Sequence, residues 1–187
     1  VYGLRQKGLD PVKDVNLVNT VGAPETIQAL MSGAVDAASV TTPQDTRAAF
    51  AGFSYVIDGR EIRAPFIAAG FVTLRSLIAK RPKAISQFMH TMAESLKLMI
   101  SDRALAFKVI SRKIGLTDQR VFDAAYSQEL KVLEPRFDIK TGAIQATLDE
   151  ISRTDPRAKQ VKPEQLIDRR FLDEMDKDGT FERLGLR

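Results

Sequence analysis

ALMSGAVDAASVTTPQD, residues 29–45, joins the end of one helix to the start of the next through a short apolar run. Gly33 follows the last apolar position of the first helix, where a left-handed backbone favours glycine. Residues 35–40 are small and apolar on both faces, which is typical of a strand buried in a parallel sheet. Two threonines and Pro43 follow, and proline suits the first turn of a helix. This segment therefore predicts a strand between two helices.

The same alternation extends through residues 1–62. A helix ends at Gly8, and another begins at Pro24. Residues 15–19 and 53–57 have the alternating or continuous apolar character of strands. The order of strand, helix, strand, helix and strand predicts an α/β fold with a parallel sheet.

Beyond residue 62 the pattern becomes mostly helical. Residues 65–73 form one more apolar run, expected as a strand, and Pro82 then opens a long amphipathic stripe that reaches Ile100. Further helices are predicted over residues 105–114, 117–125, 141–151 and 163–175. A few strands beside so many helices make an incomplete sheet, so we expect the sequence to be the later part of a longer protein.

Composition excludes several functional classes. The chain has 187 residues, no cysteine and 44% hydrophobic residues, so it can bury a core but cannot form disulfides or thiolate metal sites. No run of 18 apolar residues is present, so no membrane-spanning segment is expected. The net charge is +4, but basic and acidic residues alternate along the second half. A nucleic-acid site needs a continuous positive surface, so none is expected.

Catalytic and metal chemistry receive little support from the residues. His90 is the single histidine and lies away from the apolar stripe of its helix, without a second histidine for a metal site. Ser32 and Ser39 lack the glycine-flanked turn of a catalytic serine. Asp149 and Glu150 are adjacent, so on a helix their carboxylates face apart. We therefore expect no enzymatic activity, no cofactor and no metal.

Thr41 and Thr42 allow two interpretations. Small ligands of α/β sheets bind beyond the carboxyl ends of strands, and a threonine hydroxyl both donates and accepts hydrogen bonds. With Pro43, the two threonines can therefore form a seat for an anion or a ring amide. Alternatively, Thr42 caps the helix and Asp45 completes a weak capping box. The residues alone leave both interpretations open.

Two other turns are candidate ligand contacts. The Gly22–Ala23 pair can let the backbone approach a ligand, or it can simply open a helix. Phe66, after Pro65, can stack on a flat ligand or belong to the core. Arg63 or Arg60, in the preceding loop, can pair with an anion through two donors or remain solvated.

Several strings resemble the substrate-binding proteins of ABC importers, in the branch for nitrate, alkylsulfonates, taurine and thiamine-pyrimidine precursors. They are KGLDPVKDVNLVNTVGAPETIQALMSGAVDAASVTTP (7–43), APFIAAGFVTLRSLIAKRPKAISQFMHTMAESLKLMISDR (64–103), IGL (114–116) and TLDEISRTDP (147–156). The resemblance covers the middle and the end of that family, and the family's first segments have no counterpart here.

The resemblance implies a two-lobe fold of the type II periplasmic binding proteins, incomplete at its N-terminus. Residues 1–62 are then most of the second α/β lobe. Residues 63–187 supply the return strand and the helical remainder of the first lobe. In such proteins the lobes close on the ligand, and the turn at Thr41 lies at the ligand cleft.

The implied function is that of the solute-binding component of an ABC transporter, located in the periplasm or otherwise outside the cytoplasm. It captures a small anionic, aromatic or heterocyclic nutrient and delivers it to a membrane permease. Two alternatives share the fold: an enzyme that synthesises a pyrimidine precursor, and the effector-binding domain of a transcription regulator. The first needs a reactive histidine or lysine in the cleft, and the second needs a helix-turn-helix upstream.

Overall fold

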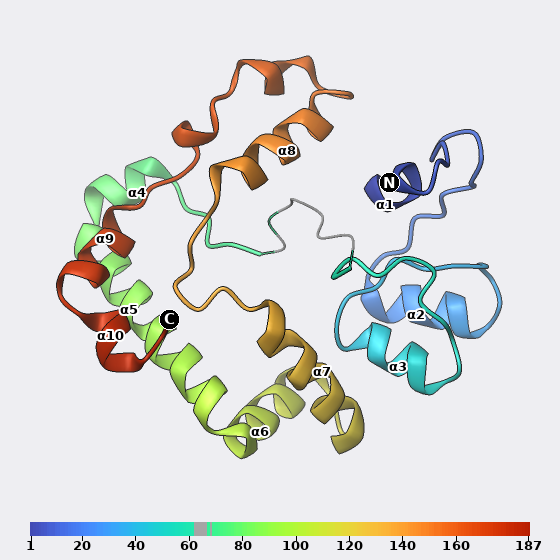
Figure 1. Ribbon diagram of the computed structural model, residues 1–187, viewed down its shortest axis with the longest axis horizontal. Helices are drawn as coiled ribbons and strands as arrows, with labels where there is room; N and C mark the ends of the chain where they lie inside the picture. The colour runs from blue at the N-terminus through green and yellow to red at the C-terminus, as the bar shows by residue number, and fades with distance from the viewer. Residues whose placement is uncertain (62–66, 68) are drawn as a thin grey trace. The chain divides into compact units, whose positions relative to one another are not determined.

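All regular elements in the described part of the chain are helices (Figure 1). The computed structural model describes residues 1–61, 67 and 69–187. The chain divides into two compact units, and each unit combines two separate stretches of sequence. Unit 1 comprises Val1–Ala64 with Phe107–Leu133, and unit 2 comprises Pro65–Ala106 with Glu134–Arg187.

Unit 1 is built from short helices joined by long irregular connections. Its helices are α1 (Tyr2–Gln6), α2 (Ala23–Met31), α3 (Gln44–Phe50), most of α6 (Arg103–Ile114) and α7 (Gln119–Val132). Helix α3 contacts both α2 and α7. Ile27, Leu30 and Ala48 form a small buried cluster, against which Val35 and Ala38 pack.

A second apolar contact of unit 1 lies where α6 meets α7. The Phe122 ring is buried there, with its centroid 5.0 Å from that of Phe107 and 5.3 Å from that of Tyr126. Asp118 caps α7 by accepting a hydrogen bond from the Arg120 N–H. The helix predicted over residues 117–125 thus begins at Gln119, two residues later, and extends to Val132.

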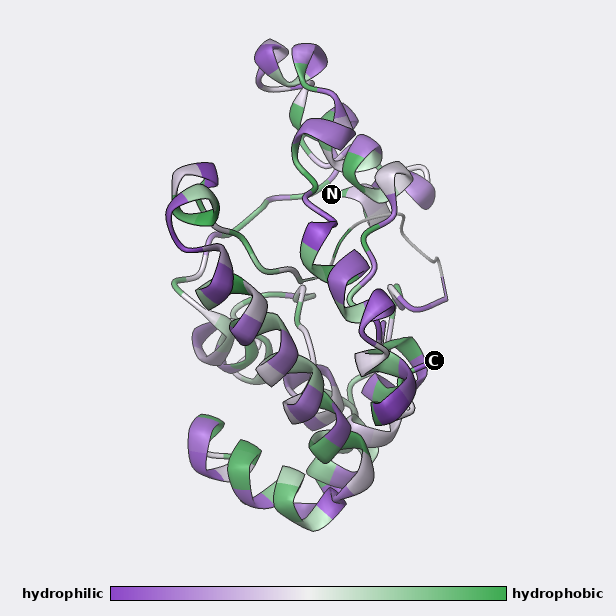
Figure 2. Cartoon of the chain, turned by 90° about the vertical axis from the view of Figure 1, so that its left-hand side faces the viewer, coloured by the Kyte–Doolittle hydropathy of each residue, from purple (hydrophilic) through white to green (hydrophobic). Residues whose placement is uncertain are grey.

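Unit 2 contains the longest described helix, α5, and most of the buried apolar side chains of the described residues. Its elements are α4 (Arg75–Lys80), α5 (Pro82–Ser101), α8 (Thr141–Ile151), the 3₁₀ turns η1 (Pro156–Gln160) and η2 (Pro163–Gln165), α9 (Arg170–Lys177) and α10 (Thr180–Leu184). Helix α5 contacts α4, α9 and α10, whereas α8 contacts η1 and η2. Hydrophilic and hydrophobic residues alternate along the helices, as amphipathic packing requires (Figure 2).

The α/β prediction is wrong. No strand occurs among the described residues, and the runs at 15–19, 35–40, 53–57 and 69–73 lie in irregular connections. A strand exists only through hydrogen bonds to a neighbouring strand, and none of these runs has such a partner within the described residues. Val35 and Ala38 instead pack beside α2. The predicted parallel sheet, and with it the two α/β lobes, is therefore absent from this part of the chain.

The helix predictions fare better. Gly8, Gly33 and Gly115 follow their helices with positive φ angles of 78°, 74° and 65°, as expected for glycine at a helix end. The amphipathic stripe opened by Pro82 becomes the 20-residue helix α5. The predicted helix over 163–175 is wrong in its extent, because η2 ends at Gln165 and α9 begins only at Arg170. The division near residue 62 stays a prediction.

Candidate functional site

The turn before α3 carries the two threonines singled out by the sequence. Thr41 is exposed, whereas Thr42 and Pro43 are half-buried, and the Thr42–Pro43 peptide bond is cis. The Thr41 carbonyl accepts a hydrogen bond from the Gln44 N–H at 2.8 Å. The backbone of the turn is thus tied to the first turn of α3.

The capping interpretation of Thr42 is not realised. Helix α3 begins after Pro43 without any side-chain cap, and the Asp45 carboxylate bonds elsewhere. Within the described residues, neither the Thr41 nor the Thr42 hydroxyl makes a hydrogen bond. A ligand role for Thr41, Thr42 and Pro43 stays a prediction, and both hydroxyls are uncommitted in this part of the structure.

A polar network supports the other side of α3. The Asp45 side chain is buried, and its Oδ1 accepts from the Thr46 N–H at 2.7 Å. Its Oδ2 accepts from the Tyr55 hydroxyl at 3.0 Å and lies 3.6 Å from Arg60 Nη1. The Arg60 guanidinium also lies over the Tyr55 ring, 5.1 Å from its centroid. This network fixes the loop after α3 to the helix.

The charges of this network are mutually satisfied. Arg60 donates from Nε and Nη2 to Asp58, each at 2.8 Å, so its two-donor edge is occupied. These hydrogen bonds lower the pKa of Asp58 and raise that of Arg60. Partial burial, with the Asp45 carboxylate, raises the pKa of Tyr55 against the opposing effect of Arg60. Arg60 is therefore a positioning residue here, and the sequence hypothesis of a free two-donor anion contact does not hold.

The Gly22–Ala23 turn behaves as a helix start. Gly22 is the N-cap of α2 in an extended conformation that any residue can adopt, and its carbonyl accepts from the Thr26 hydroxyl at 2.8 Å. Ala23 is exposed at the first position of the helix. Their contact with a ligand stays a prediction. Arg63, Pro65 and Phe66, the other predicted contacts, lie outside the described residues.

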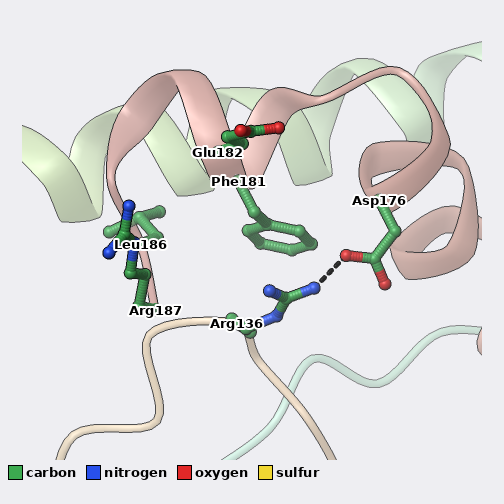
Figure 3. Close-up of a pocket in the computed structure, with 6 residues that line it drawn as sticks. All are labelled: Arg136, Asp176, Phe181, Glu182, Leu186 and Arg187. Carbon is green, nitrogen blue, oxygen red and sulfur yellow. Dashed lines mark hydrogen bonds and ion pairs between the residues drawn. The ribbon is translucent and has the colours of Figure 1, made fainter.

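Unit 2 contains a pocket that the sequence did not indicate (Figure 3). It has a volume of about 420 Å³ and is lined by Arg136, Asp176, Phe181, Glu182, Leu186 and Arg187. The Arg136 guanidinium lies 4.9 Å from the centroid of the buried Phe181 ring and forms an ion pair with Asp176. Phe137 follows in a left-handed conformation with a φ of 56°, which is rare for a bulky residue.

The charged side chains that line this pocket balance one another. Arg136 forms an ion pair with Asp176, and the lining also contains Glu182 and Arg187, so it holds two basic and two acidic side chains. No signal in the sequence could have found the pocket, because Arg136 and Asp176 lie 40 residues apart. The arrangement explains how the loop after α7 is held against α9 and α10 in unit 2.

Two absences are limited to the described part of the chain. No group of three or more histidine, cysteine, aspartate or glutamate side chains is arranged to hold a metal ion there. None of the helices described combines the length and the apolar composition needed to cross a bilayer.

Comparison with known families gives one match. The model of the NMT1-like family matches residues 1–111, more than half of the chain. The chain belongs to the NMT1-like family. This family is associated with the substrate-binding proteins of ABC transporters, which suggests that its members bind small molecules. The match includes the turn at Thr41 and Thr42. No curated protein and no solved structure matches the chain.

Proposed function

We propose that this NMT1-like chain is the solute-binding component of an ABC transporter. It captures a small anionic, aromatic or heterocyclic nutrient outside the cytoplasm, in the periplasm or its equivalent, and delivers it to a membrane permease without altering it chemically. The observation that carries this proposal is the family match over residues 1–111.

The turn before α3 supports the proposal at the level of residues. Thr41 and Thr42 place two hydroxyls at a backbone that is fixed by the Gln44 N–H and by the buried Asp45 nearby. A hydroxyl can donate to a sulfonate, nitrate or carboxylate oxygen and can accept from a ring N–H. The network around Asp45 fixes the loop after α3 to that helix, and since its groups are already paired, they do not compete with the threonines for the ligand.

Thermal-shift measurements with the purified chain test the function. A ligand that binds only the folded state raises the melting temperature by mass action. We expect at least one compound from nitrate, taurine, alkylsulfonates, aromatic acids and pyrimidines to do so, and mass spectrometry to recover it unchanged after incubation. Conversion into a product would replace the proposal by the enzyme alternative. No stabilisation by any compound of these classes would contradict the proposal.

A double substitution, Thr41→Ala with Thr42→Ala, tests the site. Two lost hydrogen bonds correspond to a total of about 1–3 kcal/mol, or roughly a 5- to 150-fold weaker affinity. Thr117→Ala is the matched control, because Thr117 is also an exposed threonine of unit 1 beside a helix start. Equal affinities of the double variant and the control would remove both threonines from the site and leave the function open to other residues.

A further inference from the structure

His90 of α5 is held by acceptors on both ring nitrogens. Its Nδ1 lies 2.9 Å from the Ser86 carbonyl oxygen, and its Nε2 lies 2.8 Å from Asp178 Oδ2. A carbonyl oxygen and a carboxylate can only accept hydrogen bonds, so both ring nitrogens must carry a proton for both bonds to form. The geometry is that of a charged imidazolium.

The partner carboxylate is fixed independently of His90. Asp178 ends α9, and its other oxygen accepts hydrogen bonds from both the N–H and the hydroxyl of the buried Thr180. Arg183 of α10 donates to the Asp178 carbonyl and to the Thr180 hydroxyl. Asp178 therefore presents its free oxygen to α5 from a rigid junction between α9 and α10.

The remaining charges around His90 also favour its protonated form. From α9, Glu174 adds a second carboxylate, which accepts from the Ser86 hydroxyl at 3.0 Å. On α5 itself, Glu94 lies one turn beyond His90. Arg183 of α10 is the cation on this side, and it is engaged by Asp178 and Thr180. The surroundings are thus negative on balance.

We propose that His90 forms a pH-dependent contact between α5 and the α9–α10 junction. While its imidazole is protonated, it binds Asp178 and holds the two together; when the proton leaves, the junction loosens. A neutral imidazole carries one N–H and one lone pair. Whichever nitrogen loses its proton then faces an acceptor oxygen with a lone pair. One of the two contacts, to Ser86 or to Asp178, must therefore break.

The direction of the effect follows from linkage. The hydrogen bond to Asp178, then that to Ser86, raises the pKa of His90 above its ordinary 6.5, although partial burial opposes this. A raised folded-state pKa means that the stabilisation is fully present below the unfolded value near 6.5. It is lost as the pH rises through the higher folded value. Asp178 stays charged in this range, because its bonds to Thr180 and His90 lower its pKa to about 2.

Nuclear magnetic resonance of the imidazole tests the first half of the proposal. The chain has a single histidine, so a sample without a histidine tag gives one set of ring signals. We expect His90 to titrate above pH 6.5 and to fall toward the ordinary value in Asp178→Asn. Glu174→Gln is the control, since its carboxylate bonds Ser86 instead of the ring, and it should shift the titration less. A wild-type titration at or below 6.5 overturns the proposal without any variant.

Amide hydrogen exchange tests the second half. After correction for the intrinsic pH dependence of exchange, residues 170–184 should lose protection between pH 5 and pH 8, whereas those of α8, in the same unit, should not. In His90→Gln the side chain cannot change its charge, so this pH dependence should disappear. Equal protection of residues 170–184 at both pH values in the wild type would refute the pH-dependent contact, even if the imidazole of His90 titrates above pH 6.5.

Discussion

Units 1 and 2 differ in how completely their apolar side chains are covered. In unit 2, Met175 and Ala93 are 0% exposed, and Phe181 is 2% exposed. Unit 1 also buries Leu116 and Phe122 almost completely, but among the described residues it holds seven buried apolar side chains against eleven in unit 2. It leaves fourteen large apolar side chains exposed against nine in unit 2, with Val18 60% and Val21 98% exposed. Burial of apolar area is the main stabilising contribution to folding, so unit 2 should carry more of the chain's resistance to unfolding.

The polar contacts of the two units differ in how far apart in the sequence their partners lie. In unit 2, ion pairs and hydrogen bonds join residues far apart in sequence, such as Arg136 with Asp176. In unit 1, Arg60 with Asp58 and Arg120 with Asp118 span two residues, and the links from Asp45 to Tyr55 and to Arg60 span ten and fifteen. Contacts between distant residues define a tertiary arrangement, whereas those within a turn mainly stabilise that turn. The comparison yields three predictions.

The largest effect is expected for Phe181→Ala in unit 2. Removing this buried ring should lower the free energy of unfolding by about 3–5 kcal/mol, because it leaves a cavity beneath Arg136. Val21→Ala in unit 1, at a side chain already exposed to water, should change it by less than about 0.5 kcal/mol. Urea denaturation followed by circular dichroism measures both. Similar losses in the two variants would show that the burial of an apolar side chain does not set its contribution to stability here.

An intermediate effect is expected for Asp45→Ala in unit 1. The substitution leaves the Tyr55 hydroxyl and the Arg60 guanidinium without their buried acceptor, which should cost about 1–3 kcal/mol. The same denaturation experiment applies, with Tyr55→Phe as the partner variant. If the free energy of unfolding falls in the double variant by the sum of the two single losses, the hydrogen bond between Asp45 and Tyr55 contributes nothing to stability.

The smallest effect is expected for Arg136→Ala in unit 2. Its ion pair with Asp176 is partly exposed, so the ion pair and the contact with Phe181 together should be worth about 1 kcal/mol. Arg157→Ala is the control, because Arg157 pairs with Asp155, two residues away on the surface. The melting temperature of the Arg157→Ala variant should match that of the wild type. A larger loss at Arg157 than at Arg136 would show that sequence separation is a poor guide here.

The candidate site divides in the same way between local and distant information. The turn at Thr41 and Thr42 was recognisable because a proline and two hydroxyls are adjacent in sequence. The ion pair of Arg60 with Asp45, fifteen residues away, and the bond of His90 to Asp178 were not. The sequence indicated neither a metal or catalytic role for His90 nor its partner, which lies 88 residues later.

The sequence by itself determined where most helices begin and end, because proline, glycine and the three- to four-residue apolar period act within a few residues. It did not determine the architecture. A strand requires a partner elsewhere in the chain, and the described residues provide none for the apolar runs that resembled strands. Tertiary contacts alone decided three features: the assembly of each unit from two separate stretches of sequence, the pocket around Arg136, and the bond of His90 to Asp178. All three depend on residues that lie far apart in the sequence, which no local pattern encodes.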